Sequence, residues 1–132
     1  MSEEYIPGVC NIGSRGRAMR LATGSAILAV SILVAVTLLG RGEMRLLRLL
    51  VVVPAYAGLL SILEGAMSFC VFHASRGTYD FFERMAFPWG SSSTRKTVES
   101  DEWRRKDLRK ARIVRLEALA GAVLLVALLL AL

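Results

Sequence analysis

Residues 21–39, LATGSAILAVSILVAVTLL, form 19 consecutive positions without a charged side chain. An α-helix rises about 1.5 Å per residue, so about 20 apolar residues are needed to cross the roughly 30 Å hydrocarbon core of a bilayer. This stretch therefore has the length and composition of a membrane-spanning helix. It predicts a fold in which lipid surrounds much of the chain.

Two more apolar runs follow. Residues 46–74 are interrupted by Arg48 and Glu64, and Pro54 lies near the start of the run. Residues 113–132 carry Arg115 and Glu117 at their entry and are uncharged after Glu117. We predict an all-α integral membrane protein with three transmembrane helices, over about 19–39, 47–74 and 113–132. The second run exceeds one vertical crossing, so we expect it to tilt or to begin in the interface.

Composition supports this class of protein. The 132 residues are 55% hydrophobic, whereas soluble domains contain about 45–50% apolar residues. Two cysteines are too few for a disulfide framework. Basic residues give a net charge of +6, and 14 of the 17 Lys and Arg residues precede the first run, lie between the second and third, or stand at the entry of the third. The positive-inside rule then places the N-terminus in the cytoplasm and the C-terminus outside, and we expect no cleavable signal peptide.

The connection between the second and third runs has two parts. Residues 78–89, TYDFFERMAFPW, are rich in aromatic side chains, which predicts a segment at the membrane interface or, alternatively, a small core under the loop. Residues 98–117 look helical, with Ser100 as N-cap, and should continue into the third span. Their basic cluster is a candidate site for anionic lipid or a soluble partner, or else a solvated charge cluster; we predict no nucleic-acid partner. The cluster consists of Arg104, Arg105, Lys106, Arg109, Lys110 and Arg112.

Cys10 and Cys70 are both expected on the cytoplasmic side. In a continuous helix Cys70 and His73 would share one face. Together the three side chains supply one ligand fewer than a closed zinc site needs. Three interpretations of Cys70 stay open: a buried structural thiol, a reactive or sulfur-accepting thiol activated by nearby arginines, and a metal ligand. We favour the first, and predict neither a metal nor another cofactor.

Glu64 is the most costly residue of the apolar runs. An ionisable side chain near the bilayer centre costs roughly 2.5–3.5 kcal/mol on insertion scales. In one continuous helix Glu64 would lie ~13 Å deeper than His73. We expect it to face protein within a narrow stripe of small and polar residues, either as an inter-helix hydrogen bond or, alternatively, as a proton or ion relay. The other members of the stripe are Ala57, Ser61, Gly65 and Ser68.

Residues 11–28, NIGSRGRAMRLATGSAIL, resemble the entry to the YgaP-like transmembrane domain family of two-span inner-membrane modules. The resemblance covers about residues 8–78, and departs from the family pattern at Gly16 and Val71. It implies a membrane module that can dimerise, and it supplies no reaction. Some relatives carry a fused rhodanese domain, which links the family to sulfur chemistry only indirectly. The matching residues are Asn11, Ile12, Gly13, Arg17, Arg20, Gly24, Phe69, Cys70 and Gly77.

We therefore predict a two-helix membrane module over residues 1–78, a cytoplasmic connector over 79–112 and a third transmembrane helix over 113–132. The favoured function is a non-catalytic accessory or scaffold subunit in the inner membrane, whose partners are the bilayer and other membrane subunits or a second copy. The alternative is a sulfur-handling or thiol-redox module that uses Cys70. A small transporter or channel is a third class, and it rests on Glu64 alone.

Overall fold

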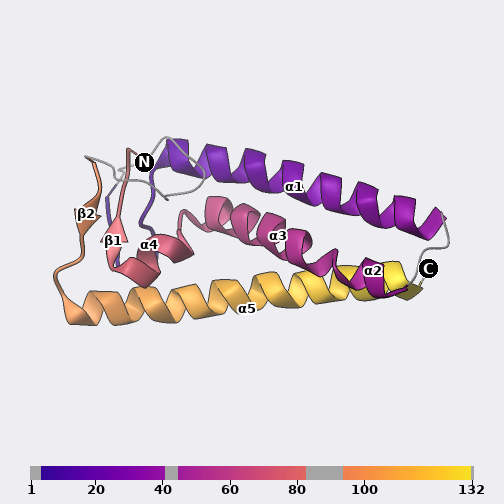
Figure 1. Ribbon diagram of the computed structural model, residues 1–132. Coiled ribbons are helices and arrows are strands. Elements are labelled where there is room, and N and C mark those ends of the chain that lie inside the picture. The colour runs from indigo at the N-terminus through magenta and orange to yellow at the C-terminus, as the bar shows by residue number, and fades with distance from the viewer. Residues whose placement is uncertain (1–3, 41–44, 83–93, 132) are drawn as a thin grey trace.

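The computed structural model describes residues 4–40, 45–82 and 94–131. Its helices are α1 (Ser14–Gly40), α2 (Arg45–Leu49), α3 (Val52–Met67), α4 (Val71–Arg76) and α5 (Asp101–Ala131). Two short strands, β1 (Thr78–Tyr79) and β2 (Lys96–Thr97), pair antiparallel. Figure 1 shows α3 between the two long helices, α1 and α5. The N-terminal segment, α4 and both strands gather at one end of the bundle, and the C-terminus lies at the other.

The first and third predicted apolar helices are present as α1 and α5. Both are long and apolar enough to cross a membrane. Their 27 and 31 residues correspond to roughly 40 and 46 Å of helix. Large apolar side chains stand on their outer faces; Leu33 is 66% exposed and Leu124 is 62% exposed. Water would solvate such faces poorly, whereas lipid would cover them.

The apolar run at 46–74 differs from the single helix predicted over 47–74, because it forms α2, α3 and α4. Pro54 lies in the first turn of α3, where its missing N–H costs no helical hydrogen bond. After α3, Ser68 adopts the left-handed conformation (φ 57°, ψ 36°), and Cys70 is extended. With 16 residues, α3 is roughly 24 Å long and shorter than the hydrocarbon core. A third span is therefore not confirmed.

Helix α5 begins as the sequence predicts. The Ser100 hydroxyl accepts a hydrogen bond from the Trp103 N–H at 3.4 Å, and Asp101 and Glu102 occupy the first turn, at the positive end of the helix dipole. The helix continues unbroken from its charged half into its apolar half, which confirms that prediction. Of the aromatic segment at 78–89, residues 83–89 lie outside the described part of the chain, and its interfacial placement stays a prediction.

The bundle packs through small residues. A Cβ atom added at Gly24 would lie 2.7 Å from the Gly58 carbonyl oxygen, and one added at Gly58 would lie 2.9 Å from the Leu28 nitrogen. Helices α1 and α3 therefore approach at backbone distance. The inward face of α5 repeats every three or four residues, as a packed helix face requires, and consists of Ala111, Val114, Ala118, Ala122 and Val126.

Candidate functional site

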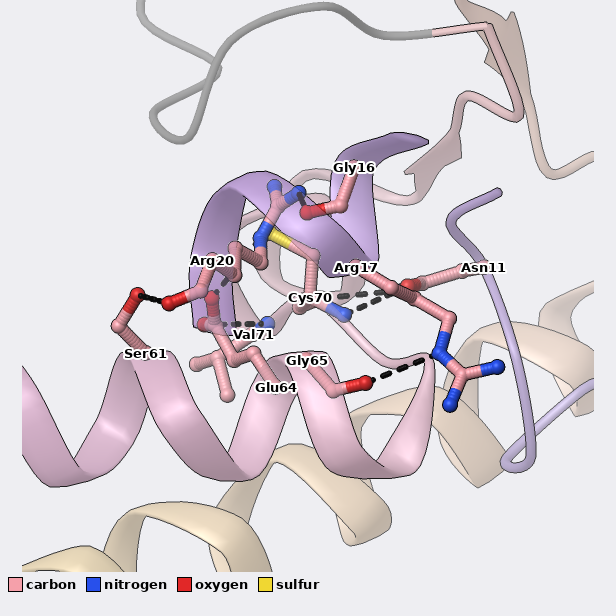
Figure 2. Close-up of polar contacts among 9 residues, drawn as sticks. All are labelled: Asn11, Gly16, Arg17, Arg20, Ser61, Glu64, Gly65, Cys70 and Val71. Atoms are coloured by element: carbon pink, nitrogen blue, oxygen red, sulfur yellow. Dashed lines mark hydrogen bonds and ion pairs between the residues drawn. The ribbon is translucent and has the colours of Figure 1, made fainter. Parts of the chain in front are cut away.

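A buried ion pair joins α1 and α3. The Arg20 Nε donates to Glu64 Oε2 at 3.1 Å, and the Arg20 side chain is fully buried. Arg20 also donates through Nη1 to the Gly16 carbonyl oxygen at 3.2 Å, while Glu64 Oε1 accepts the Val71 N–H at 3.1 Å. Figure 2 shows this pair between the two helices. Glu64 thus faces protein, as predicted, and its partner is an arginine that the sequence analysis placed at a membrane end.

The continuous helix on which the predicted depth of Glu64 relied is broken. The estimate assumed one continuous helix through His73, but the chain changes direction between Ser68 and Cys70. This change lets the Glu64 carboxylate reach the first N–H of α4, at Val71. Glu64 therefore joins three elements, α1, α3 and α4, at one point.

The predicted packing stripe on α3 is partly correct. Ser61 and Gly65 are buried, and the Ser61 hydroxyl donates to the Arg20 carbonyl oxygen at 2.9 Å. The Gly65 carbonyl oxygen accepts from Arg17 Nε at 3.0 Å. Ala57 is exposed, so its assignment to this stripe is wrong, and Gly58 lies in the α1 contact instead. The contact with α1 therefore involves Gly58, one residue after Ala57, with which the predicted stripe began.

Asn11 holds the break that follows α3. Its side-chain Nδ2 donates to the Cys70 carbonyl oxygen at 3.0 Å, and its Oδ1 accepts the Cys70 N–H at 2.6 Å. The Asn11 N–H donates to the Ser68 carbonyl oxygen at 3.0 Å. Its carbonyl oxygen accepts the Asp80 N–H at 3.1 Å. One residue thus satisfies backbone groups from two segments that are distant in sequence, and Ser68 belongs to this clamp rather than to the helix contact.

Cys70 lies inside this clamp and is 1% exposed. Burial raises the pKa of its thiol to about 11, and the Glu64 carboxylate contributes in the same direction. Reactive cysteines have a lowered pKa and an accessible sulfur. The geometry therefore favours the buried structural thiol over the thiol-redox alternative, although Arg20 lies beside Cys70 (Figure 2).

Cys10 and His73 have separate local partners. Cys10 Sγ donates to the Glu4 carbonyl oxygen at 3.0 Å, and His73 Nδ1 lies 2.8 Å from the Thr78 hydroxyl. Cys70 caps α4, while His73 is buried within that helix. Across residues 4–40, 45–82 and 94–131, no group of three or more His, Cys, Asp or Glu side chains is arranged to hold a metal ion.

A second buried carboxylate ties the N-terminal segment to α5. Asp107 is fully buried; its Oδ2 accepts from the Tyr5 hydroxyl at 2.6 Å and its Oδ1 from the Gly8 N–H at 2.8 Å. Burial is the largest cause that raises the Tyr5 pKa, followed by the hydrogen bond to Asp107. Sequence analysis did not single out Asp107, because it lies within a run of charged residues. The one available signal was its position on the same helical face as Ala111 and Val114.

The basic cluster of α5 lies on the surface, away from the Arg20–Glu64 pair. Lys110 is half-buried, and the remaining members, Arg104, Arg105, Lys106, Arg109 and Arg112, are exposed. Lys106 forms a surface ion pair with Glu102, with 3.6 Å between Nζ and Oε1. Anionic-lipid binding by these residues stays a prediction.

The residues quoted for the family resemblance converge in the structure: Asn11 contacts Cys70, Arg20 binds Glu64, and Gly24 contacts Gly58. These contacts make one polar and close-packed junction rather than a catalytic cavity. No known family, characterised protein or solved structure has detectable similarity to the chain, and the YgaP-like resemblance remains a prediction.

Proposed function

We propose that the chain is a multi-pass membrane protein that acts as a non-catalytic accessory or scaffold subunit, and that the outer face of α1 over residues 18–29 is its docking surface. One observation carries the proposal: over residues 18–29 this face is exposed and consists of small residues. Ala18, Ala22, Ser25 and Ala29 are all exposed. At 100° per residue they lie within about 60° of one another around the helix axis.

This face is on the opposite side of α1 from α3. Gly24, Ser31 and Ala35 are buried on the inner side. Lipid is as apolar as leucine, so helices associate in a bilayer mainly where small residues permit close packing. The outer face of α5 is instead bulky, with Leu116, Leu124 and Leu128 each about 60% exposed. We assign the α1 face to a helix of a second copy or another subunit, and the α5 face to lipid.

The buried polar groups support a structural role. Arg20 and Glu64 bind each other, Asn11 binds backbone groups, and Asp107 binds the N-terminal segment. These groups hold the helices together and leave the chain's outer surfaces for association. The same arrangement makes Glu64 a helix-joining residue rather than a step in a proton relay.

The proposed orientation keeps the N-terminus in the cytoplasm and the C-terminus outside the inner membrane. The N-terminal segment and the start of α5 lie at the same end of the bundle (Figure 1), as this orientation requires. At that end the exposed members of the basic cluster nearest the apolar half of α5, Arg109 and Arg112, would contact anionic headgroups, at ~1 kcal/mol for each Lys or Arg near the surface. This supports a membrane anchor whose cationic end faces the cell interior.

Bulky substitutions test the docking face. In Ala22→Leu and Ala29→Leu, the added atoms would separate the backbones at the α1 interface, so the partner or second copy should no longer co-purify in mild detergent. The matched controls Ala120→Leu and Ala127→Leu place the same atoms on exposed positions of α5 and should retain it. Equal loss of the co-purifying partner from the α1 variants and the α5 variants would refute the assignment of the docking surface to α1. Absence of any second copy or bound subunit from the unsubstituted protein would refute the scaffold function.

A further inference from the structure

An aromatic pocket lies at the end of the bundle where the N-terminal segment meets β1, β2 and the first turn of α5. Its volume is about 340 Å³. Five rings line it, those of Tyr5, Tyr79, Phe81, Phe82 and Trp103. A pocket of this volume lies within the range of small-molecule sites, and neither helix packing nor the proposed α1 docking face requires it.

Four of the five rings are held in fixed mutual positions. Tyr5 stacks on Tyr79 with ring centroids 4.4 Å apart and planes at 11°, and its hydroxyl binds the buried Asp107. Trp103 is tilted against Tyr5 at 5.9 Å, and Phe81 meets Tyr79 edge-on at 6.1 Å. The pocket wall is therefore preorganised through contacts that reach from the N-terminal segment to α5.

The pocket wall also stays open to solvent. Phe82 is 65% exposed and Trp103 is 45% exposed, so much of their aromatic surface has no cover from the described residues. Aromatic faces attract organic cations, because the ring carries negative charge density above its plane. Glu4 and Lys96 also line the pocket, and their side chains carry opposite charges. A plain cation would be repelled by Lys96, whereas a zwitterion would satisfy both charges.

We propose that this pocket binds a small zwitterion that joins a quaternary ammonium group to an anionic group, as in phosphocholine. The aromatic rings and Glu4 receive the trimethylammonium group, and Lys96 receives the phosphate. No covalent step is involved. The pocket is independent of the α1 docking face, so either proposal can fail without the other.

The same headgroup chemistry occurs in a soluble metabolite and in a phospholipid. Trp103 precedes the apolar half of α5, which starts near Ile113, by ten residues, or roughly 15 Å along the helix. The headgroup layer is only about 5–8 Å thick on each side of the hydrocarbon core. With the apolar half of α5 in the bilayer, this distance favours a soluble ligand over a lipid headgroup.

The test uses the full chain in a maltoside detergent, which has no ammonium group. Trp89→Phe leaves Trp103 as the reporter, since the chain has two tryptophans. Phosphocholine should change its fluorescence saturably. The isostere 3,3-dimethylbutyl phosphate, in which carbon replaces the ammonium nitrogen, should bind at least about tenfold more weakly, because it retains the shape and the phosphate but loses the cation. Equal affinity for both compounds, or no saturable change with phosphocholine, would overturn the proposal.

Two variants assign the contacts. Phe82→Leu keeps apolar bulk at an exposed position and should weaken phosphocholine binding about two- to fivefold, as loss of an exposed cation–π contact predicts. Lys96→Gln should abolish the preference for phosphocholine over choline, and an unchanged preference would refute the role of Lys96. Circular dichroism should show both variants folded. In nanodiscs, phosphocholine binding can be compared between phosphatidylcholine and phosphatidylglycerol bilayers. Weaker binding in phosphatidylcholine would identify the lipid headgroup as the ligand source, and equal binding in both would identify the soluble compound.

Discussion

The ion pair between Arg20 and Glu64 provides the sharpest test of how the bundle is held together. Glu64→Leu would leave the buried guanidinium without its counter-charge and the Val71 N–H without its acceptor. Removal of one partner from a buried pair costs about 3–5 kcal/mol. We therefore expect the free energy of unfolding to fall by at least that amount. Arg20→Met should cost a similar amount, because it leaves the carboxylate alone.

The double variant separates the pair from its surroundings. When both charges are removed, the Val71 N–H is the remaining group without its original acceptor, at a cost of roughly 1–3 kcal/mol. Arg20→Met combined with Glu64→Leu should thus be more stable than either single variant. The coupling between the two positions is then several kcal/mol, well beyond the ~0.5 kcal/mol expected for independent sites.

The assay is reversible unfolding in mixed maltoside and dodecyl sulfate micelles, monitored by circular dichroism. Glu117→Gln, at an exposed position of α5, is the matched control and should change stability by less than about 0.5 kcal/mol. If the stability loss of the double variant equalled the sum of the losses of the two single variants, the two side chains would not be coupled. That result would refute the account of the junction.

Three further predictions concern the contacts around this junction. Gly24→Ala would place a Cβ atom 2.7 Å from the Gly58 carbonyl oxygen and should lower the free energy of unfolding by about 1–3 kcal/mol in the same assay. The control Ser25→Ala, at an exposed position, should leave stability unchanged, and equal stabilities of the two variants would contradict the close helix contact. Tyr5→Phe removes the hydrogen bond to the buried Asp107 and should cost about 1.5–3 kcal/mol, with Tyr56→Phe as control; an unchanged midpoint would show that this bond contributes nothing. Cys70 should resist N-ethylmaleimide at pH 8 in the folded chain and react after unfolding, and rapid labelling of the folded chain would contradict its burial. Because the folded-state pKa of the Cys70 thiol, about 11, exceeds the unfolded value of about 8.5, the contribution of this thiol to stability should be lost as pH rises between those values.

Local sequence signals were sufficient for the long helices. The charge-free run of residues 21–39 and the capped, charged start of α5 each indicate a helix through residues of the helix itself. We therefore predicted α1 and α5 near their observed bounds. Gly77 also carries a local signal, since it ends α4 in the left-handed conformation that glycine adopts readily.

The break after α3 could not be found in this way. Residues around Ser68 are mostly apolar and continue the pattern of the preceding helix, and serine rarely adopts a left-handed conformation. The hydrogen bonds that hold the break come from Asn11, 59 residues away from Cys70 in the chain. A tertiary contact therefore overrides the local preference for one continuous helix.

The partner of Glu64 was missed for a related reason. The cost of a buried carboxylate correctly predicted that Glu64 faces protein. The choice of Arg20 depends on the register between α1 and α3, which the approach of Gly24 to Gly58 fixes. Hydropathy shows which runs are apolar but not which turns of two helices are neighbours, so Arg20 was assigned to a membrane end.

Solvent accessibility of engineered cysteines tests the central claim, that lipid covers the outer face of α5 and the part of the outer face of α1 that follows its docking segment at residues 18–29. Leu33→Cys and Leu124→Cys each introduce a thiol at a position that is exposed in the isolated chain, in a background with Cys10→Ser and Cys70→Ala. Arg109→Cys, in the basic cluster of α5, is the exposed control. In opened native membranes, a water-soluble maleimide should label the Arg109 position and spare the other two until detergent unfolds the chain. Equal labelling of all three positions before unfolding would show that water reaches these faces and would contradict the account.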